Sequence, residues 1–139
     1  MDNTTEPPDS PEAKLEKSRI LHVDDDADIR LLISASLRDF GYFVVTAGSV
    51  AEALHLAKDL KFDLFILDVR LPDGTGIELC QQLRQLQPDT RAIYYSAYAS
   101  EAEQKAALSL CGDAYLKKPV LPEYLEQAIA KLLHRKSKL

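Results

Sequence analysis

The chain has 139 residues and a formal net charge of −5, and 46% of its residues are hydrophobic. These values are typical of one soluble globular domain with a single core. They argue against broad nucleic-acid binding, which needs a basic face, and no apolar run approaches the roughly 18 residues of a membrane helix.

The first 17 residues, MDNTTEPPDSPEAKLEK, combine five acidic and two basic residues with three prolines. This composition predicts a disordered tail over residues 1–17, and its acidic start is not typical of a signal peptide. The folded domain is expected over residues 18–136, followed by a short basic C-terminal end over residues 137–139. Because this leaves no segment for a second domain, a single-domain protein is predicted.

Strand-like and helix-like segments alternate from Arg19 onward. Residues 19–23 form a short apolar run that predicts a strand. Apolar residues then recur at helical spacing up to Phe40, and Gly41 is placed to end that helix. A β-branched and aromatic run over residues 42–47 predicts the second strand.

The middle of the chain continues the alternation. A helix over residues 49–60 and another over about 75–87 each begin with a capping box, in which a serine or threonine lies three residues before a glutamate. The apolar run over residues 62–67 predicts the third strand between these helices, and residues 91–96 predict the fourth strand.

The last part of the chain completes the pattern. A capping box at Ser100 begins a helix that ends near Cys111, residues 114–118 predict the fifth strand, and Pro122 occupies the first turn of a final helix ending near Arg135. Five strand–helix units in strict alternation predict an α/β fold with a parallel sheet and helices on both faces.

Three residues with reactive side chains are predicted to be structural. Cys80 and Cys111 lie in apolar helical stretches. Cysteine is among the most buried residue types, so reduced core thiols are predicted in preference to the alternative, a disulfide between the two. Reduced thiols fit the reducing cytoplasm, which is the expected location of the protein. His22, inside the first strand, is predicted to be a hydrogen-bonded core histidine and not a ligand.

Polar side chains gather at the carboxyl ends of four of the five predicted strands. They are Asp24, Asp25 and Asp26 after the first strand, Asp68 after the third, Ser96 at the end of the fourth and Lys118 at the end of the fifth. In open parallel sheets, ligands bind outside these strand ends at the point where the strand order reverses. The second strand contributes no charged residue, which predicts that it lies at an edge of the sheet.

These residue types together indicate phosphoryl chemistry. Carboxylates that lie close together repel one another, and a hard divalent cation such as Mg²⁺ relieves the repulsion. A lysine ammonium and a hydroxyl can bind a phosphoryl group, and an aspartate can accept one covalently. Two simpler interpretations stay open: Asp24–Asp26 could be acids that suit a helix N-terminus, and Asp68 could merely end a strand. The agreement of four strand ends favours a site.

At these residues the sequence resembles the receiver domain of bacterial two-component response regulators, over residues 19–135. The segments that carry the resemblance are HVDDD, LDVRLPDGTG, YYSA and YLKKP. The resemblance implies a flavodoxin-like, doubly wound five-stranded parallel sheet with strand order 2-1-3-4-5. It also implies a phosphoprotein of a two-component system or phosphorelay.

The resemblance assigns roles to the acidic residues. Asp68 is expected to be the phosphorylation site. Magnesium is expected to bind Asp24, Asp25, Asp68 and the backbone carbonyl of Arg70. Lys118 is expected to bind the phosphoryl group and to take part in the reaction together with Asp68.

The resemblance also assigns residues to the conformational change that follows phosphorylation and to the rate at which the phosphoryl group is lost. Ser96 is expected to be the catalytic switch hydroxyl and Tyr115 the switch aromatic, and the Lys118–Pro119 bond is usually cis in the family. Arg70 and Tyr98 are expected to line the approach of the water that hydrolyses the aspartyl phosphate. Because both side chains are large and neither carries a carboxylate or amide to orient a water, slow hydrolysis is expected.

The predicted function is a single-domain response regulator that catalyses only its own phosphorylation and dephosphorylation. A histidine kinase or histidine phosphotransfer protein is expected to supply the phosphoryl group. The phosphoryl oxygens would pull Ser96 inward and leave space for Tyr115. The face made by the fourth helix, the fifth strand and the fifth helix would then bind a downstream protein partner, with no direct nucleic-acid or membrane contact.

Three other functions agree less well with the sequence. A haloacid-dehalogenase-like phosphatase would carry an aspartate two residues after the nucleophile, where this chain has Arg70. A degenerate receiver that serves only as a scaffold would have lost a site residue. A DNA-binding regulator would need an output domain that this sequence lacks, unless the sequence is one part of a longer protein.

Overall fold

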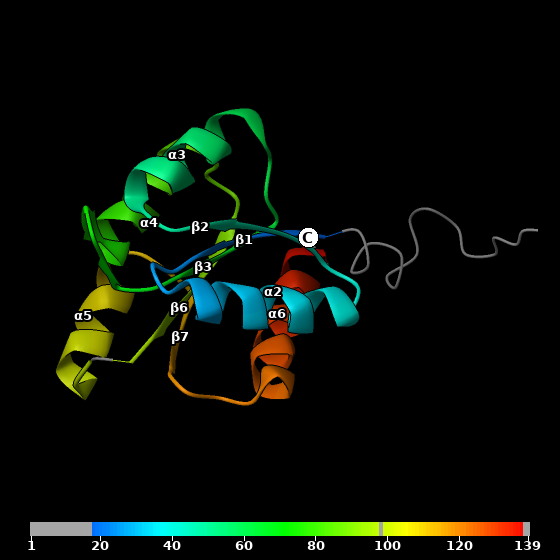
Figure 1. Cartoon of the computed structure of the whole chain (residues 1–139). Coiled ribbons are helices and arrows are strands. Elements are labelled where there is room, and N and C mark those ends of the chain that lie inside the picture. The colour runs from blue at the N-terminus through cyan, green and yellow to red at the C-terminus, as the bar shows by residue number, and fades with distance from the viewer. Residues whose placement is uncertain (1–17, 98, 138–139) are drawn as a thin grey trace, which may run out of the picture.

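The computed structural model describes residues 18–97 and 99–137 and shows a parallel sheet between two layers of helices (Figure 1). Along the chain the elements of the main fold are β1 (Arg19–Val23), α2 (Ala27–Asp39), β2 (Phe43–Ala47), α3 (Val50–Asp59), β3 (Leu64–Leu67), α4 (Gly76–Leu86), β6 (Arg91–Ser96), α5 (Glu101–Leu110), β7 (Ala114–Lys117) and α6 (Pro122–Ser137). The predicted alternation of strands and helices is confirmed. The predicted tail over residues 1–17 lies outside the described residues.

The five strands pair in the order β2-β1-β3-β6-β7, and every neighbouring pair is parallel. This is the order that the family resemblance implied, with β2 at one edge, which explains why β2 contributes no charged residue to the site. The register places Val23 of β1 beside Leu67 of β3, so these two strands end at the same level. The residues that follow them are therefore brought together at one edge of the sheet.

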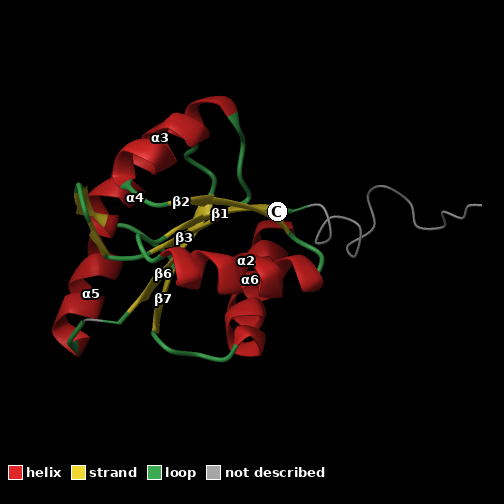
Figure 2. Ribbon diagram, in the orientation of Figure 1, coloured by secondary structure: helices red, strands yellow, loops and turns green. Residues whose placement is uncertain are grey.

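Each face of the sheet buries its own hydrophobic core. Helices α3, α4 and α5 cover one face, and α2 and α6 cover the other (Figure 2). Successive side chains of a strand point to opposite faces, so Leu21 of β1 packs under the first layer and Ile20 under the second. Because both faces are covered, the central strand β3 is buried along its whole length.

A short antiparallel hairpin, β4 (Arg70–Leu71) and β5 (Gly74–Thr75), follows β3 and was not expected from the sequence. It ends at Thr75, the N-cap of α4, whose side chain accepts a hydrogen bond from the amide of Glu78. Asp73 in the hairpin turn accepts hydrogen bonds from the first amides of α3, at 2.8 and 3.0 Å. The hairpin therefore connects the end of β3 to the starts of two helices.

The prediction of two reduced thiols is wrong, because Cys80 and Cys111 form a disulfide across 31 residues of sequence. Cys80 lies on α4, and Cys111 is the C-cap of α5, the neighbouring helix. Their Cα atoms are 6.1 Å apart, which is within the ordinary range for disulfides. The sequence pattern showed that both residues would be buried, but it could not show that they would be neighbours.

None of the helices in the described part of the chain is both long and apolar enough to cross a membrane.

Candidate functional site

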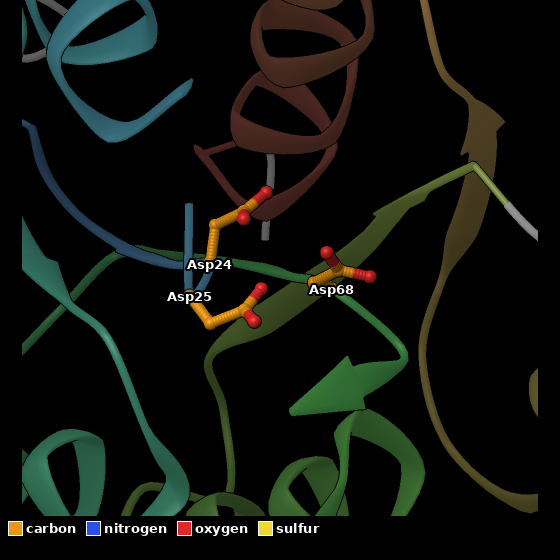
Figure 3. Close-up of side chains that lie close together, drawn as sticks. All are labelled: Asp24, Asp25 and Asp68. Atoms are coloured by element: carbon orange, nitrogen blue, oxygen red, sulfur yellow. The ribbon is translucent and has the colours of Figure 1, made fainter. Parts of the chain in front are cut away.

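Three carboxylates meet at the carboxyl end of the sheet (Figure 3). Asp24 follows β1 and Asp68 follows β3, and each is held by a backbone hydrogen bond of 3.0 Å to the neighbouring strand. One oxygen each of Asp24, Asp25 and Asp68 lies within 4.8 Å of the others. Asp24 is only 1% exposed and Asp68 9% exposed, whereas Asp25 is exposed to solvent.

The third acid of the triplet, Asp26, has a different role. It is the N-cap of α2, and its side chain accepts hydrogen bonds from the amides of Asp28 and Ile29 at 2.9 and 3.3 Å. Asp24 in turn accepts a hydrogen bond of 2.9 Å from the Asp26 amide. The helix-capping interpretation of the acidic triplet therefore holds for Asp26 alone, while Asp24 and Asp25 face Asp68.

Lys118 joins the two buried carboxylates. Its ammonium donates hydrogen bonds to Oδ2 of Asp24 and, at 3.0 Å, to Oδ2 of Asp68. Burial acts to lower the pKa of Lys118, but the hydrogen bonds to the two carboxylates outweigh it, so the pKa is raised and the ammonium stays charged. Burial raises the pKa of Asp24 in spite of the hydrogen bond from Lys118. The Lys118–Pro119 peptide bond is cis, as expected.

Ser96 contacts the other oxygen of Asp68. This serine is completely buried at the end of β6, and its hydroxyl donates a hydrogen bond of 2.7 Å to Oδ1 of Asp68. The backbone amide of Arg70 donates to the same oxygen at 3.3 Å. The two oxygens of Asp68 are therefore bound by different groups, one by Ser96 and Arg70 and the other by Lys118.

The carboxylates open onto a pocket of about 370 Å³. Its lining consists of Asp24, Asp25, Asp26, Ile29, Asp68, Arg70, Ala97 and Lys118. Arg70 is thus placed at the pocket as expected, whereas Tyr98, its expected partner in limiting hydrolysis, lies outside the described residues. Asp68 is therefore part of the lining of an open pocket.

Tyr115 lies on β7 and is not among the residues that line this pocket. Its ring packs against the ring of Tyr94 on β6, with centroids 5.7 Å apart. The Tyr115 hydroxyl is buried and has no partner in hydrogen-bond geometry among the described residues, although the Ser96 hydroxyl, which donates to Asp68, lies near it. Burial raises the pKa of the Tyr115 hydroxyl, although the Ser96 hydroxyl acts in the opposite direction.

His22 lies behind the site, on β1, and is 1% exposed. Its predicted burial is confirmed, but the expected hydrogen bonding is wrong for Nδ1, which has no partner among the described residues. Burial, with Lys118 as the next cause, lowers the pKa of His22 to about 4, so the ring is neutral at pH 7.

Two residues that hold the site backbone were missed by the sequence interpretation. The Arg30 side chain donates a hydrogen bond of 2.7 Å to the carbonyl of Asp24, which holds the loop after β1. Gly76 donates from its amide to the carbonyl of Val69 at 2.7 Å and has no room for a side chain beside the backbone of Asp68. The glycine after the Asp68 segment was a visible signal, whereas the role of Arg30 depends on how α2 packs.

Comparisons with known proteins agree with this arrangement. A family model described as "Response regulator receiver domain" matches residues 20–130. The chain is 38% identical over 122 residues to "Probable transcriptional regulator ycf27" of Guillardia theta, covering 88% of this chain and 48% of that protein. It is 38% identical over 117 residues to "Alkaline phosphatase synthesis transcriptional regulatory protein PhoP" of Bacillus subtilis, covering 84% and 49%. The chain thus spans about half the length of these curated relatives.

Solved structures of similar proteins have the same fold. A CheY-like response regulator receiver domain protein from Methanospirillum hungatei matches with a TM-score of 0.83 and 35% identity, covering 87% of this chain and 97% of that one. A response regulator protein from Burkholderia pseudomallei, with a phosphorylated aspartic acid, a calcium ion and citrate, matches with a TM-score of 0.77 and 31% identity, covering 86% and 72%. The chain therefore belongs to the receiver domain family of two-component response regulators.

Proposed function

We propose that the domain accepts a phosphoryl group on Asp68 in a Mg²⁺-dependent reaction. The observation that carries the proposal is the environment of Asp68, which has Lys118 on one oxygen, Ser96 on the other and two further carboxylates beside it. A helix cap or a strand end needs no such set of groups. A buried carboxylate that is bound on both oxygens and still lines an open pocket is suited to react there.

The acidic residues fit a divalent cation. Asp24, Asp25 and Asp68 offer oxygen ligands only, and these oxygens lie within 4.8 Å of one another. Hard cations such as Mg²⁺ prefer carboxylate and carbonyl oxygens and keep several waters. We propose that these three residues, together with the backbone carbonyl of Arg70, hold the ion. When bound, Mg²⁺ neutralises charge that develops on the transferring phosphoryl group.

The transfer itself needs one bond to form and one to break. An oxygen of Asp68 bonds to phosphorus, the bond from phosphorus to the donor's leaving group breaks, and the leaving group takes up a proton. Lys118 would exchange its hydrogen bond with Asp68 for one with a phosphoryl oxygen, as would the Ser96 hydroxyl. The position of the general acid in aspartyl-phosphate phosphatases is Arg70 here, so the domain is proposed to act as a signalling acceptor and not on a separate substrate.

We propose that a histidine kinase or a histidine phosphotransfer protein supplies the phosphoryl group in the cytoplasm. Movement of Ser96 and Tyr115 would then alter the face made by α5, β7 and α6, to which a downstream protein would bind without direct contact to nucleic acid. That the chain works as a single-domain regulator stays a prediction, because the curated relatives are about twice as long.

Labelling by acetyl phosphate tests the proposal. With Mg²⁺ present, the protein should gain one acid-stable, base-labile phosphoryl group, and Asp68→Asn should remove it without unfolding the domain. Asp26→Asn is a matched control, since it changes a neighbouring acid whose capping role asparagine can fill, and it should be labelled normally. Equal labelling of Asp68→Asn and the parent protein, or no labelling of the parent, would show the assignment to be wrong.

A further inference from the structure

The disulfide closes a loop of the chain that contains Ser96, the expected switch hydroxyl. It joins Cys80 of α4 to Cys111 at the C-cap of α5, at a sequence separation of 31, and the segment between them includes all of β6 with Ser96 and all of α5. The amide of Cys111 still donates to the carbonyl of Ala107 at 3.0 Å, so the disulfide is attached to the last turn of the helix. It therefore fixes the C-terminal end of α5 onto α4.

The turn at Cys111 and Gly112, which follows α5, packs against the side chain of Tyr94. The Tyr94 hydroxyl donates a hydrogen bond of 2.9 Å to the carbonyl of Cys111. Gly112 turns the chain with φ of +98°, and a Cβ there would lie 2.5 Å from Cε2 of Tyr94. Only glycine fits this turn, because the backbone lies directly on the tyrosine ring. A shift of this turn therefore has to move Tyr94.

Tyr94 continues the contacts toward Asp68. It is paired in register with Tyr115 on β7, and the two rings are in contact. Ser96 lies two residues after Tyr94 on the same strand, so it faces the same side of the sheet, and it donates to Asp68. A continuous set of neighbouring residues therefore runs from the disulfide through Tyr94, Tyr115 and Ser96 to Asp68, the proposed phosphorylation site.

We propose that Cys80 and Cys111 form a reversible redox site that controls how readily Asp68 is phosphorylated, an inference that rests on the proposed function. Cytoplasmic disulfides are usually transient and redox-sensing. Cys80 is completely buried and Cys111 is 7% exposed, so Cys111 is the residue of the two that has surface open to an external thiol. The matching ligand is a dithiol reductant, and a disulfide of the same class would reverse the reaction.

The exchange is balanced in electrons and protons. A thiolate of the reductant attacks Sγ of Cys111, forms a mixed disulfide and expels the thiolate of Cys80, which takes up a proton. The second thiolate of the reductant then attacks the mixed disulfide and releases Cys111, which takes up a proton as well. The cystine gains two electrons and two protons, and the dithiol loses the same and becomes a disulfide.

The direction of the effect follows from the contacts. With the disulfide intact, Tyr94 is held beneath Tyr115, whose hydroxyl is buried next to Ser96. Phosphorylation is proposed to draw Ser96 toward the phosphoryl group and to let Tyr115 move into the space that Ser96 leaves. A fixed Tyr94 ring supports Tyr115 in that position, so the disulfide preorganises the domain for phosphorylation. Reduction frees the turn after α5 and lets Tyr115 occupy other positions, which disfavours the phosphorylated state. Coupling of this kind typically changes an equilibrium by about fivefold or more.

The test compares the whole chain in its oxidised form and after reduction by excess dithiol, with thiol titration to verify zero and two thiols. Labelling by acetyl phosphate in Mg²⁺ should need about fivefold more donor in the reduced protein. The double variant Cys80→Ala/Cys111→Ala should behave like the reduced parent in both buffers. Tyr94→Phe should lose most of the redox effect, and Tyr42→Phe, which removes a tyrosine hydroxyl on the other face of the sheet, should keep it.

Amide NMR resonances of Ser96 and Tyr115 separate this inference from the proposed function. They should shift on reduction even without phosphodonor, because the coupling does not need phosphate. If neither form is labelled, the proposed function fails, while the resonances still decide whether the disulfide reaches the switch. Equal labelling and unchanged resonances in a protein with two titrated thiols would overturn the inference, as would a native disulfide that dithiol cannot reduce.

Discussion

Gly76 offers the sharpest test of how the site is held together. It is the first residue of α4, and its amide donates to the carbonyl of Val69, which closes the loop that carries Asp68. In Gly76→Ala the added Cβ would lie 2.9 Å from the carbonyl carbon of Asp68, 3.0 Å from Cα of Val69 and closer still to the Asp68 carbonyl oxygen. These are backbone atoms, so no side-chain rotation can relieve the clash.

The size of the effect follows from these distances. Ordinary contacts of a Cβ begin at 3.4 Å, so the loop and α4 must separate by at least 0.5 Å, the difference between 3.4 and 2.9 Å. Overpacking of this kind costs about 1–3 kcal/mol of unfolding free energy. A reacting group misplaced by about 1 Å can lose about 100-fold in rate, so we expect labelling of Asp68 to slow by about tenfold.

Two measurements on a matched pair check this expectation. Gly48→Ala is the control, because its Cβ would meet side-chain atoms of Arg30 and no backbone atom, the nearest being Nη1 at 3.0 Å. Since Nη1 also donates to the carbonyl of Asp24, Arg30→Ala measures separately what loss of that hydrogen bond costs. Urea unfolding followed by circular dichroism gives the loss of stability, and acetyl phosphate labelling in Mg²⁺ gives the rate. The reasoning would be refuted if Gly76→Ala unfolded and were labelled like Gly48→Ala.

Three further changes separate other parts of the site. Lys118→Ala should keep or tighten Mg²⁺ binding in calorimetry but lose phosphorylation-dependent change, and a large loss of Mg²⁺ affinity in the folded variant would contradict the proposed role. The pKa of His22 falls from 6.5 to about 4 on folding, so only the unfolded chain binds this proton between those pH values, and the unfolding free energy drops by about 3 kcal/mol as the pH falls from 6.5 to 4. His22→Val should lack this part of the pH dependence in urea titrations, and an unchanged pH profile would count against it. Arg70→Ala and Tyr98→Ala should each lose phosphate faster than the parent by up to about tenfold, equivalent to about 1.4 kcal/mol of barrier. If both variants lose phosphate no faster than the parent, these side chains do not shield the aspartyl phosphate from water.

Sequence reasoning predicted the elements well because their signals are local. The strands β1 and β6 begin and end at the predicted residues, since apolar runs and polar strand ends bound them sharply. The strand order came from the family resemblance, because alternation of strands and helices alone fits several orders. The β4–β5 hairpin was missed because strands of two residues carry too little pattern to be seen.

The parts of the site that failed to appear in the sequence depend on tertiary packing. Adjacent acids look alike in sequence, yet a change of one position decides that Asp26 caps α2 while Asp25 faces Asp68. The pairing of Cys80 with Cys111 requires α4 to lie beside the end of α5, which no local pattern encodes. For His22, the apolar strand around it predicted burial, but the absence of a partner for Nδ1 depends on every side chain packed against it.

The charges of the site explain why its geometry suits a reversible signal. Three carboxylates and the Lys118 ammonium leave a formal charge of −2, which one divalent cation would balance. A phosphoryl group on Asp68 then brings new negative charge into a place where Asp24 is almost fully buried and already has a raised pKa. That charge must draw in donors that can move, and Ser96 is the completely buried donor already directed at Asp68. On the proposed function, the response to phosphorylation begins where Ser96 and Lys118 exchange their hydrogen bonds with Asp68, and Tyr94 and Tyr115 carry the Ser96 part of it toward the surface.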